Sequence, residues 1–324
     1  SKSRGIPGLR KAKARYYQSR FGVKLDPESE INVTIGSKEG LFALAMAIAG
    51  PDDYIVIPSP CYPIHEWGFV LANSQVERIS NLPGQDFLGE FKALVKKRRK
   101  KPRAVLVNYP CNPTAADVDL AFYQELVAFC QAEKIYIISD LAYAELYYNQ
   151  AKPPSILQIP GARDLAIEFT SMSKSFSMAG WRIGFAAGAA QLIKIMAKLK
   201  SYLDYGAFTP IQIAAITALD QAESYTPQIR EIYRERRDII CDGLNKLGWP
   251  VTKPNSSMFV WCQIPTAYQA LDSLAFSKLV LSQSDCVVSP GLGFGAEGEG
   301  YVRIALVENK NRLRQAVRNL KKIF

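Results

Sequence analysis

Short apolar runs of strand-like composition alternate with helical patterns along the first part of the chain, and this alternation limits the fold more than any other feature. Six such runs occur in order, at residues 31–35, 54–57, 104–109, 135–139, 165–170 and 183–187. Strands that alternate with helices predict an α/β fold with a largely parallel sheet. In sheets of this kind, ligands bind at the carboxyl ends of the strands.

Several unusual polar side chains follow these runs closely. A serine, two tyrosines, an asparagine, an acid and a lysine each lie within a few residues after a strand: Ser37, Tyr62, Asn112, Asp140, Tyr143 and Lys174. Because parallel strands bring their carboxyl ends to one edge of the sheet, we expect these side chains to meet in a single site.

The stretch of residues 171–185 places Lys174 in a turn rich in serine and glycine between two buried strands. Lysine is rarely buried without a partner. A desolvated amine loses its proton readily and becomes a nucleophile. Taken alone, the stretch is also compatible with an exposed loop lysine, so its interpretation depends on the other strand-end residues.

The pattern changes in the last third of the chain. One or two helices cover about 188–218, and a long charged helix covers about 225–247. Shorter strand-like runs follow at 258–263, 286–289 and 302–306, together with a helix near 270–283 and a basic C-terminal helix. We therefore expect a large α/β domain at 1–218 and a smaller α+β domain at 219–324, which the long helix enters.

Composition argues against a membrane protein, a disulfide-bonded protein and a histidine-based metalloprotein. The longest apolar run, at 40–50, is too short to span a bilayer, so no membrane partner is expected. The six cysteines are scattered without a CxxC pair, which favours reduced thiols in the cytoplasm. The single histidine, His65, argues against a histidine-based metal centre, so no metal is expected, and His65 itself is expected to be structural.

Much of the net charge of +10 comes from the basic run at 96–101. A basic run can bind nucleic acid. This one lacks interleaved aromatic residues and directly precedes a buried-strand pattern, which favours a solvated loop. No nucleic-acid partner is therefore expected.

The expected site has the chemical groups that pyridoxal phosphate (PLP) needs. The glycine turn at 36–40, between a strand and a helix, presents backbone N–H groups to a phosphate. A lysine can form the Schiff base, and a carboxylate opposite the pyridine nitrogen keeps that nitrogen protonated. Arginine and serine bind the phosphate through charge-assisted hydrogen bonds.

Four spaced motifs resemble those of the class I/II aminotransferases of PLP fold type I. They are Ser171-x-x-Lys174 with Arg182 eight residues later, Asn112-Pro-Thr114, Asp140-x-x-Tyr143 and the late Arg303. The motifs keep the family's order, and the match covers the chain from about residue 4. The resemblance implies a large domain with a mostly parallel sheet between helices, and a smaller C-terminal domain.

The resemblance also implies a role for each residue. Lys174 is the implied Schiff-base lysine and moves the proton between substrate Cα and cofactor C4′. Asp140 is the implied partner of the pyridine nitrogen. The remaining roles are hydrogen bonds to the phenolic oxygen of the ring (Tyr143 and Asn112), the phosphate cup (Ser171, Arg182 and the backbone around Ser37 and Lys38), stacking on the ring (Tyr62) and binding of the substrate carboxylate (Arg303, with Asn112). The alternative for Tyr143 and Tyr62 is a core position, and for Arg303 a strand face.

Within the family, the sequence looks most like the bacterial alanine transaminase subgroup, which is related to the LL-diaminopimelate aminotransferases. This implies a cytoplasmic homodimer with shared active sites that moves an amino group from L-alanine to 2-oxoglutarate. The family's N-terminal arm is absent from the sequence, and Ala115 replaces a common glycine.

Several alternatives stay open on sequence grounds. The substrate could be LL-diaminopimelate or aspartate, and the same residues could catalyse another PLP reaction such as β-elimination. A more distant alternative is a PLP-binding regulatory domain, a class that carries an N-terminal helix-turn-helix domain not found in these residues.

Overall fold

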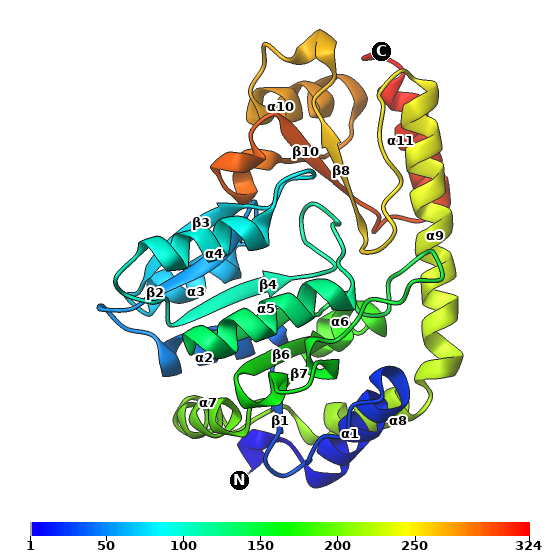
Figure 1. Ribbon diagram of the computed structural model, residues 1–324. Helices are drawn as coiled ribbons and strands as arrows, with labels where there is room; N and C mark the ends of the chain where they lie inside the picture. Colours follow the sequence, from blue (N-terminus) through cyan, green and yellow to red (C-terminus); the bar gives the residue numbers. More distant parts are fainter. Residues whose placement is uncertain (1) are drawn as a thin grey trace.

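Two β-sheets of unequal size organise the chain, and the long helix α9 runs beside both of them (Figure 1). The computed structural model describes residues 2–324. The first sheet has the order β1-β7-β6-β5-β4-β2-β3 and the second has the order β8-β10-β9. The strands are β1 (Ile31–Thr34), β2 (Tyr54–Ser59), β3 (Gln75–Ser80), β4 (Ala104–Asn108), β5 (Tyr136–Asp140), β6 (Ala166–Ser171), β7 (Gly184–Gly188), β8 (Phe259–Gln263), β9 (Ser289–Pro290) and β10 (Tyr301–Ala305).

The first sheet is mixed, with a parallel majority. Strands β3, β2, β4, β5 and β6 pair in parallel, whereas β7 is antiparallel to both of its neighbours, β6 and β1. Strand β1 therefore runs in the same direction as β6, and the carboxyl ends of six strands share one edge. The register pairs Asn108 of β4 with Asp140 of β5 at that edge. The expectation of an α/β fold with a largely parallel sheet is confirmed.

Helices cover both faces of this sheet. The helices are α1 (Pro7–Phe21), α2 (Ser37–Ile48), α3 (Ile64–Leu71), α4 (Phe87–Lys97), α5 (Leu120–Glu133), α6 (Met172–Ser175), α7 (Ala190–Leu203), α8 (Thr209–Asp220), α9 (Ala222–Lys246), α10 (Ser273–Ser284) and α11 (Lys310–Leu320). Helices α1, α4, α5 and α8 bury residues such as Leu9 and Phe91 against one face. Helices α2, α3 and α7 bury Leu44, Phe69 and Met196 against the other.

The second sheet is antiparallel and packs beside α9, α10 and α11 (Figure 1). Its core contains Trp249, Phe276 and Val302. A short pairing of Tyr147 with Ser256 joins the segment after β5 to the segment before β8. Segments that flank the two sheets therefore meet next to the carboxyl edge of the first sheet.

Some elements were not expected from the sequence. The sequence did not predict strand β3 or helices α3 and α4. Strand β9 (Ser289–Pro290) shares only its first residue with the run expected at 286–289. Strand β3 lies at the edge of the sheet and is largely exposed, so it lacks the apolar run that marks a buried strand. The basic run starts in the last turn of α4, and two of its members form ion pairs, Arg98 with Glu77 and Lys101 with Glu133. Among the described residues, none of the helices is long and apolar enough to cross a membrane.

Candidate active site

One cavity of about 350 Å³ collects all ten residues that the sequence singles out. It lies where the carboxyl edge of the first sheet meets the second sheet. The ten residues that line it are Ser37, Lys38, Tyr62, Asn112, Asp140, Tyr143, Ser171, Lys174, Arg182 and Arg303. Asn108, Met258 and Phe259 also line it.

The acid of the site, Asp140, ends β5 and is buried. Its Oδ2 lies 2.8 Å from Nε2 of His65, a fully buried residue of α3. Because a carboxylate accepts hydrogen bonds, Nε2 of His65 is the donor. Asn108 donates from Nδ2 to the Asp140 carbonyl oxygen at 2.8 Å, and its Oδ1 accepts from the Asn112 N–H at 2.9 Å.

Sequence reasoning missed the contribution of His65 and Asn108 to the site. His65 was expected to be structural, but the structure places it against the carboxylate of the site. Its Nδ1 has no hydrogen-bond partner among the described residues. The sequence held one local signal, which is that His65 follows Tyr62 by three residues. In the structure His65 lies at the start of α3, and the Tyr62 and His65 rings meet edge to face with centroids 5.8 Å apart.

The lysine of the site, Lys174, lies in the short helix α6 directly after β6. Ser171 caps this helix by accepting a hydrogen bond from the Ser173 N–H at 3.2 Å. Burial lowers the pKa of Lys174, and the positive charges of Arg182 and Arg303 lower it further. A larger fraction of neutral amine, which is the nucleophilic form, follows at a given pH.

The start of α2 forms an anion cradle with Arg182. The N-cap residue is Gly36, at φ 81°, so no side chain caps the N–H groups of the first turn. A Cβ atom on Gly36 would collide with the Arg182 guanidinium, and one on Gly184 would lie 2.7 Å from the Ser37 nitrogen. Arg182 donates to the Ser173 hydroxyl at 3.3 Å. Uncapped N–H groups, an arginine and serines suit a phosphate.

Arg303 approaches the cavity from β10 of the second sheet. Its Nη1 donates to Asn112 Oδ1 at 2.6 Å, and its guanidinium lies 4.2 Å from the ring centroid of Phe259 and 4.5 Å from that of Phe294. Burial lowers the pKa of Arg303, although a guanidinium stays charged. Its Nη2 donates to the Ser289 hydroxyl at 3.4 Å, and its buried Nε has no partner among the described residues. A guanidinium has five N–H donors, so others remain for a planar carboxylate.

The two tyrosines differ in their surroundings. Tyr143 is buried and packs edge to face on Phe259, with ring centroids 5.6 Å apart. Burial and the negative charge of Asp140 raise the pKa of Tyr143, so the phenol keeps its proton and remains a donor. Tyr62 is half-buried at the cavity, and Lys38 Nζ lies 5.8 Å from its ring centroid.

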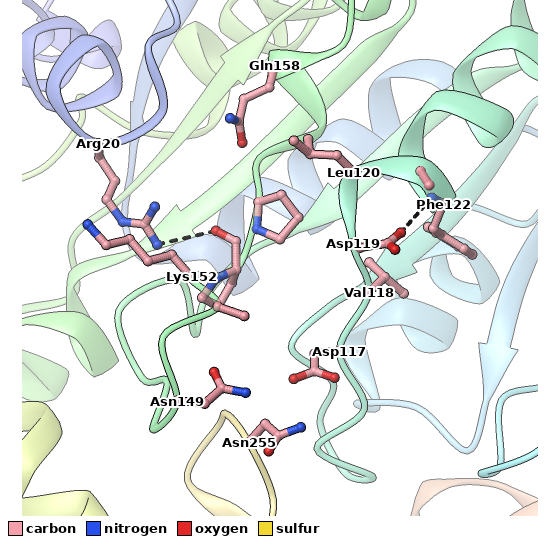
Figure 2. A pocket seen from close by; sticks show the side chains of 14 residues that line it. Arg20, Asp117, Val118, Asp119, Leu120, Phe122, Asn149, Lys152, Gln158 and Asn255 are labelled. Atoms are coloured by element: carbon pink, nitrogen blue, oxygen red, sulfur yellow. Dashed lines mark hydrogen bonds between the residues drawn. The ribbon is translucent and has the colours of Figure 1, made fainter.

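A larger pocket of about 950 Å³ lies elsewhere, next to the start of α5, and Figure 2 shows its lining. It holds Arg20 and Lys152 toward one side and Asp117 and Asp119 toward the other. None of the ten residues singled out from the sequence lines it. The convergent lysine, acid and anion cradle belong to the smaller cavity.

The chain matches a known family over nearly its whole length. The model of the family "Aminotransferase class I and II" covers residues 1–320. The chain belongs to this family. Aminotransferases of this kind use PLP and exchange amino groups between amino acids and 2-oxo acids, and the anion cradle, lysine and buried acid of this chain fit that cofactor.

Named relatives agree with the assignment. This aminotransferase is 47% identical to the glutamate-pyruvate aminotransferase AlaC of Escherichia coli, over 100% of this chain and 79% of AlaC. It is 42% identical to the LL-diaminopimelate aminotransferase of Natranaerobius thermophilus, over 99% of this chain and 82% of the relative. Among solved structures, substrate-bound BacF of Bacillus subtilis matches with a TM-score of 0.91 and 33% identity, over 99% of this chain and 81% of BacF.

Proposed function

We propose that this aminotransferase moves the amino group of L-alanine to 2-oxoglutarate, with PLP held in the 350 Å³ cavity through Lys174. The observation that carries the proposal is the convergence on one cavity of Lys174, the His65-supported Asp140 and the uncapped start of α2. The identity to AlaC supports alanine as the donor. The identity to an LL-diaminopimelate aminotransferase makes that amino acid the second candidate.

Each residue has a distinct task in this proposal. When bound, PLP supplies an electron sink for the pair left at the substrate α-carbon. Lys174 would hold the cofactor through Nζ, and its free amine would take the substrate α-proton and return it. Asp140, oriented by His65, keeps a proton on the pyridine nitrogen. Because burial and neighbouring cations lower the pKa of Lys174, its amine is ready to act as a base.

The other residues bind and orient. Ser37 and Lys38 at the start of α2, with Ser171 and Arg182, hold the phosphate. Tyr62 would stack on the ring of the cofactor, and Tyr143 and Asn112 would donate hydrogen bonds to its phenolic oxygen. Arg303 would bind the substrate α-carboxylate through the guanidinium N–H groups that do not donate to Asn112.

We also propose a homodimer with shared active sites. Three aromatic residues at the end of α7 and in the loop that leads to α8 are strongly exposed: Tyr202 at 73%, Tyr205 at 95% and Phe208 at 70%. Large apolar side chains gathered on the surface of one chain mark an interaction site. An interface there would cover them.

Two further parts of the proposal concern organisation. We propose a large domain at 1–218 and a small domain at 219–324, although this boundary falls in the last turn of α8, two residues before its end and just before α9 begins at Ala222. The six free cysteines support a reducing compartment such as the cytoplasm.

The test is a visible absorption spectrum of the PLP-loaded protein before and after single L-amino acids are added. We expect a band of Lys174-bound PLP that L-alanine removes and 2-oxoglutarate restores. Removal by LL-diaminopimelate but not by L-alanine would favour the second candidate. Release of ammonia and pyruvate without an amino acceptor would instead indicate β-elimination. A protein that forms no such band would refute the proposed function.

A further inference from the structure

Glu145 is a buried carboxylate that the proposed reaction does not use. It is 3% exposed and lies in the turn that follows β5, two residues after Tyr143. A buried charge needs partners, since an unpaired one costs several kcal/mol. The partners of Glu145 come from two helices that lie far apart in the sequence.

The first partner helix is α1. The Tyr16 hydroxyl and Arg20 Nε, at 2.9 Å, both donate to Oε1 of Glu145. Burial and the Glu145 charge raise the pKa of Tyr16, so its hydroxyl keeps the proton that it donates. Arg20 also donates from Nη2 to the Ala144 carbonyl at 3.1 Å. Helix α1 therefore holds both the side chain and the backbone of the turn.

The second partner helix is α9, which runs from the first sheet to the second. Arg230 Nη1 lies 3.6 Å from Oε2 of Glu145, and the guanidinium lies 4.0 Å from the ring centroid of Tyr147. Next to Arg230, Ile229 packs against a cluster that contains Tyr143 and Phe259. The Glu145 carboxylate thus contacts Arg20 of α1, which packs on the first sheet, and Arg230 of α9, which leads to the second sheet.

The turn that contains Glu145 is also connected to residues that line the cavity. The Leu146 N–H donates to the Tyr143 carbonyl at 3.0 Å, and the Ala142 N–H donates to Oδ1 of Asp140 at 3.2 Å. The Tyr143 ring packs on Phe259, and Phe259 packs on Arg303. A shift of the turn would therefore move Tyr143 relative to both Asp140 and Arg303.

We propose that Glu145 is a positioning residue, which fixes the turn that carries Tyr143 by binding Arg20 of α1 and Arg230 of α9 at the same time. Loss of the carboxylate frees the turn, and the hydroxyl of Tyr143 no longer meets the phenolic oxygen of PLP at a fixed distance. The inference rests on the proposed function, because it assigns Tyr143 the hydrogen bond to the cofactor.

The test compares Glu145→Gln with the unaltered protein, both loaded with PLP. A glutamine keeps the size of the side chain and removes its charge. The first readout is the pH titration of the visible band of Lys174-bound PLP, whose midpoint depends on the hydrogen bonds to the phenolic oxygen. We expect the midpoint to move by about half a pH unit or more, and kcat/KM to fall about tenfold.

Glu28→Gln is the matched control. Glu28 pairs with Arg10 on the same helix, with Arg10 Nη2 at 2.7 Å from Oε2, but it does not contact the turn. We expect this variant to titrate and turn over like the unaltered protein. If Glu145→Gln does not fold, Arg230→Gln tests the same contact at a less buried side chain. We expect Arg230→Gln to shift the titration midpoint by less than Glu145→Gln would.

The outcomes separate the two proposals. A visible band whose titration is the same in Glu145→Gln, Arg230→Gln and Glu28→Gln overturns the role of Glu145 and leaves the proposed function intact. A shift in the first two variants alone supports the role. No band in the unaltered protein overturns both proposals.

Discussion

Lys174 carries the central chemical proposal at the scale of single residues. Its amine lies in the same cavity as Arg182 and Arg303, and burial with these two charges lowers its pKa. We expect Lys174→Ala to reduce transamination by at least about 10³-fold, because the variant loses both the covalent link and the proton-transfer base. Steady-state turnover with L-alanine and 2-oxoglutarate measures the loss.

The control for this variant is cofactor binding. Lys174→Ala leaves the start of α2, Arg182 and Asp140 in place, so PLP should still bind without a covalent bond. Equilibrium dialysis measures this binding. Turnover close to that of the unaltered protein would remove Lys174 from its proposed role.

His65 gives a second prediction at this scale. A hydrogen bond to a charged group contributes about 1.5–3 kcal/mol, which corresponds to about 10- to 100-fold in rate if the bond matters during the reaction. We expect His65→Leu to lose about this much kcat, because the Asp140 carboxylate loses the donor at 2.8 Å. His65→Gln keeps an N–H donor and should retain more activity than His65→Leu. Equal kcat in both variants and the unaltered protein would mean that His65 only fills space.

Helix α1 illustrates an element whose polar side chains are buried. Lys13 is 3% exposed, and its Nζ lies 4.3 Å from the ring centroid of Tyr16, 4.9 Å from that of Tyr17 and 4.8 Å from that of Phe185. Burial lowers the pKa of Lys13 to about 7, although the charges of Glu168 and Glu145 oppose this. The Lys13 ammonium group is therefore stabilised by three aromatic rings between α1 and the first sheet.

The low pKa predicts how stability depends on pH. The unfolded chain has an ordinary lysine pKa of about 10.5, so between about pH 7 and 10 the unfolded state binds one proton more than the folded state. The free energy of unfolding therefore rises with pH in this window. We expect the unaltered protein to gain up to about 1.4 kcal/mol per pH unit relative to Lys13→Met. Urea unfolding at several pH values measures the difference, and parallel curves for the two proteins would contradict it.

The same helix shows what could and could not be predicted from sequence. Residues 8–21 read as a helix in the sequence, and α1 agrees closely with this range because Gly22 ends the helix as a left-handed C-cap. The burial of Lys13 and the partial burial of Arg20 were not foreseen, because the nearby charge of Glu168 and the Arg20 partner Glu145 lie more than a hundred residues away in the sequence. Local pattern does not contain such pairings.

The site follows the same rule. Lys174, Asp140 and Asn112 were predicted to meet because each follows a strand, and strand order alone brings those positions to one edge. The contact of His65 with Asp140 joins helix α3 to strand β5, and α3 was not among the expected helices. Motif spacing located the groups proposed to react, while the groups that contact them depend on tertiary packing.

At the scale of the whole molecule, the exposed aromatic residues between α7 and α8 support the proposed dimer. We expect the double variant Tyr205→Glu with Phe208→Glu to sediment as a monomer, because two charges in a buried interface are costly. The unaltered protein should sediment as a dimer at micromolar concentration. Analytical ultracentrifugation measures both.

Val287→Glu is the control for this prediction. Val287 is 80% exposed but lies after α10, away from the segment between α7 and α8. A charge there should leave the dimer intact. A double variant that remains dimeric, or an unaltered protein that is already monomeric, would contradict the assignment of the interface.

Arg303 is the one residue of the ten that belongs to the second sheet; the other nine precede residue 183. The groups proposed to hold the cofactor and the arginine proposed to hold the substrate carboxylate are therefore encoded in separate stretches of the gene, joined through α9, while Asn112, which contacts Arg303, lies in the first stretch. Recombination between relatives within α9 would exchange Arg303 and keep the cofactor groups, provided that the incoming segment preserves the contacts with Asn112 and Tyr143. Chimaeras of this kind offer a route by which new substrate preferences could arise, in nature or in the laboratory, on an unchanged set of cofactor-binding residues.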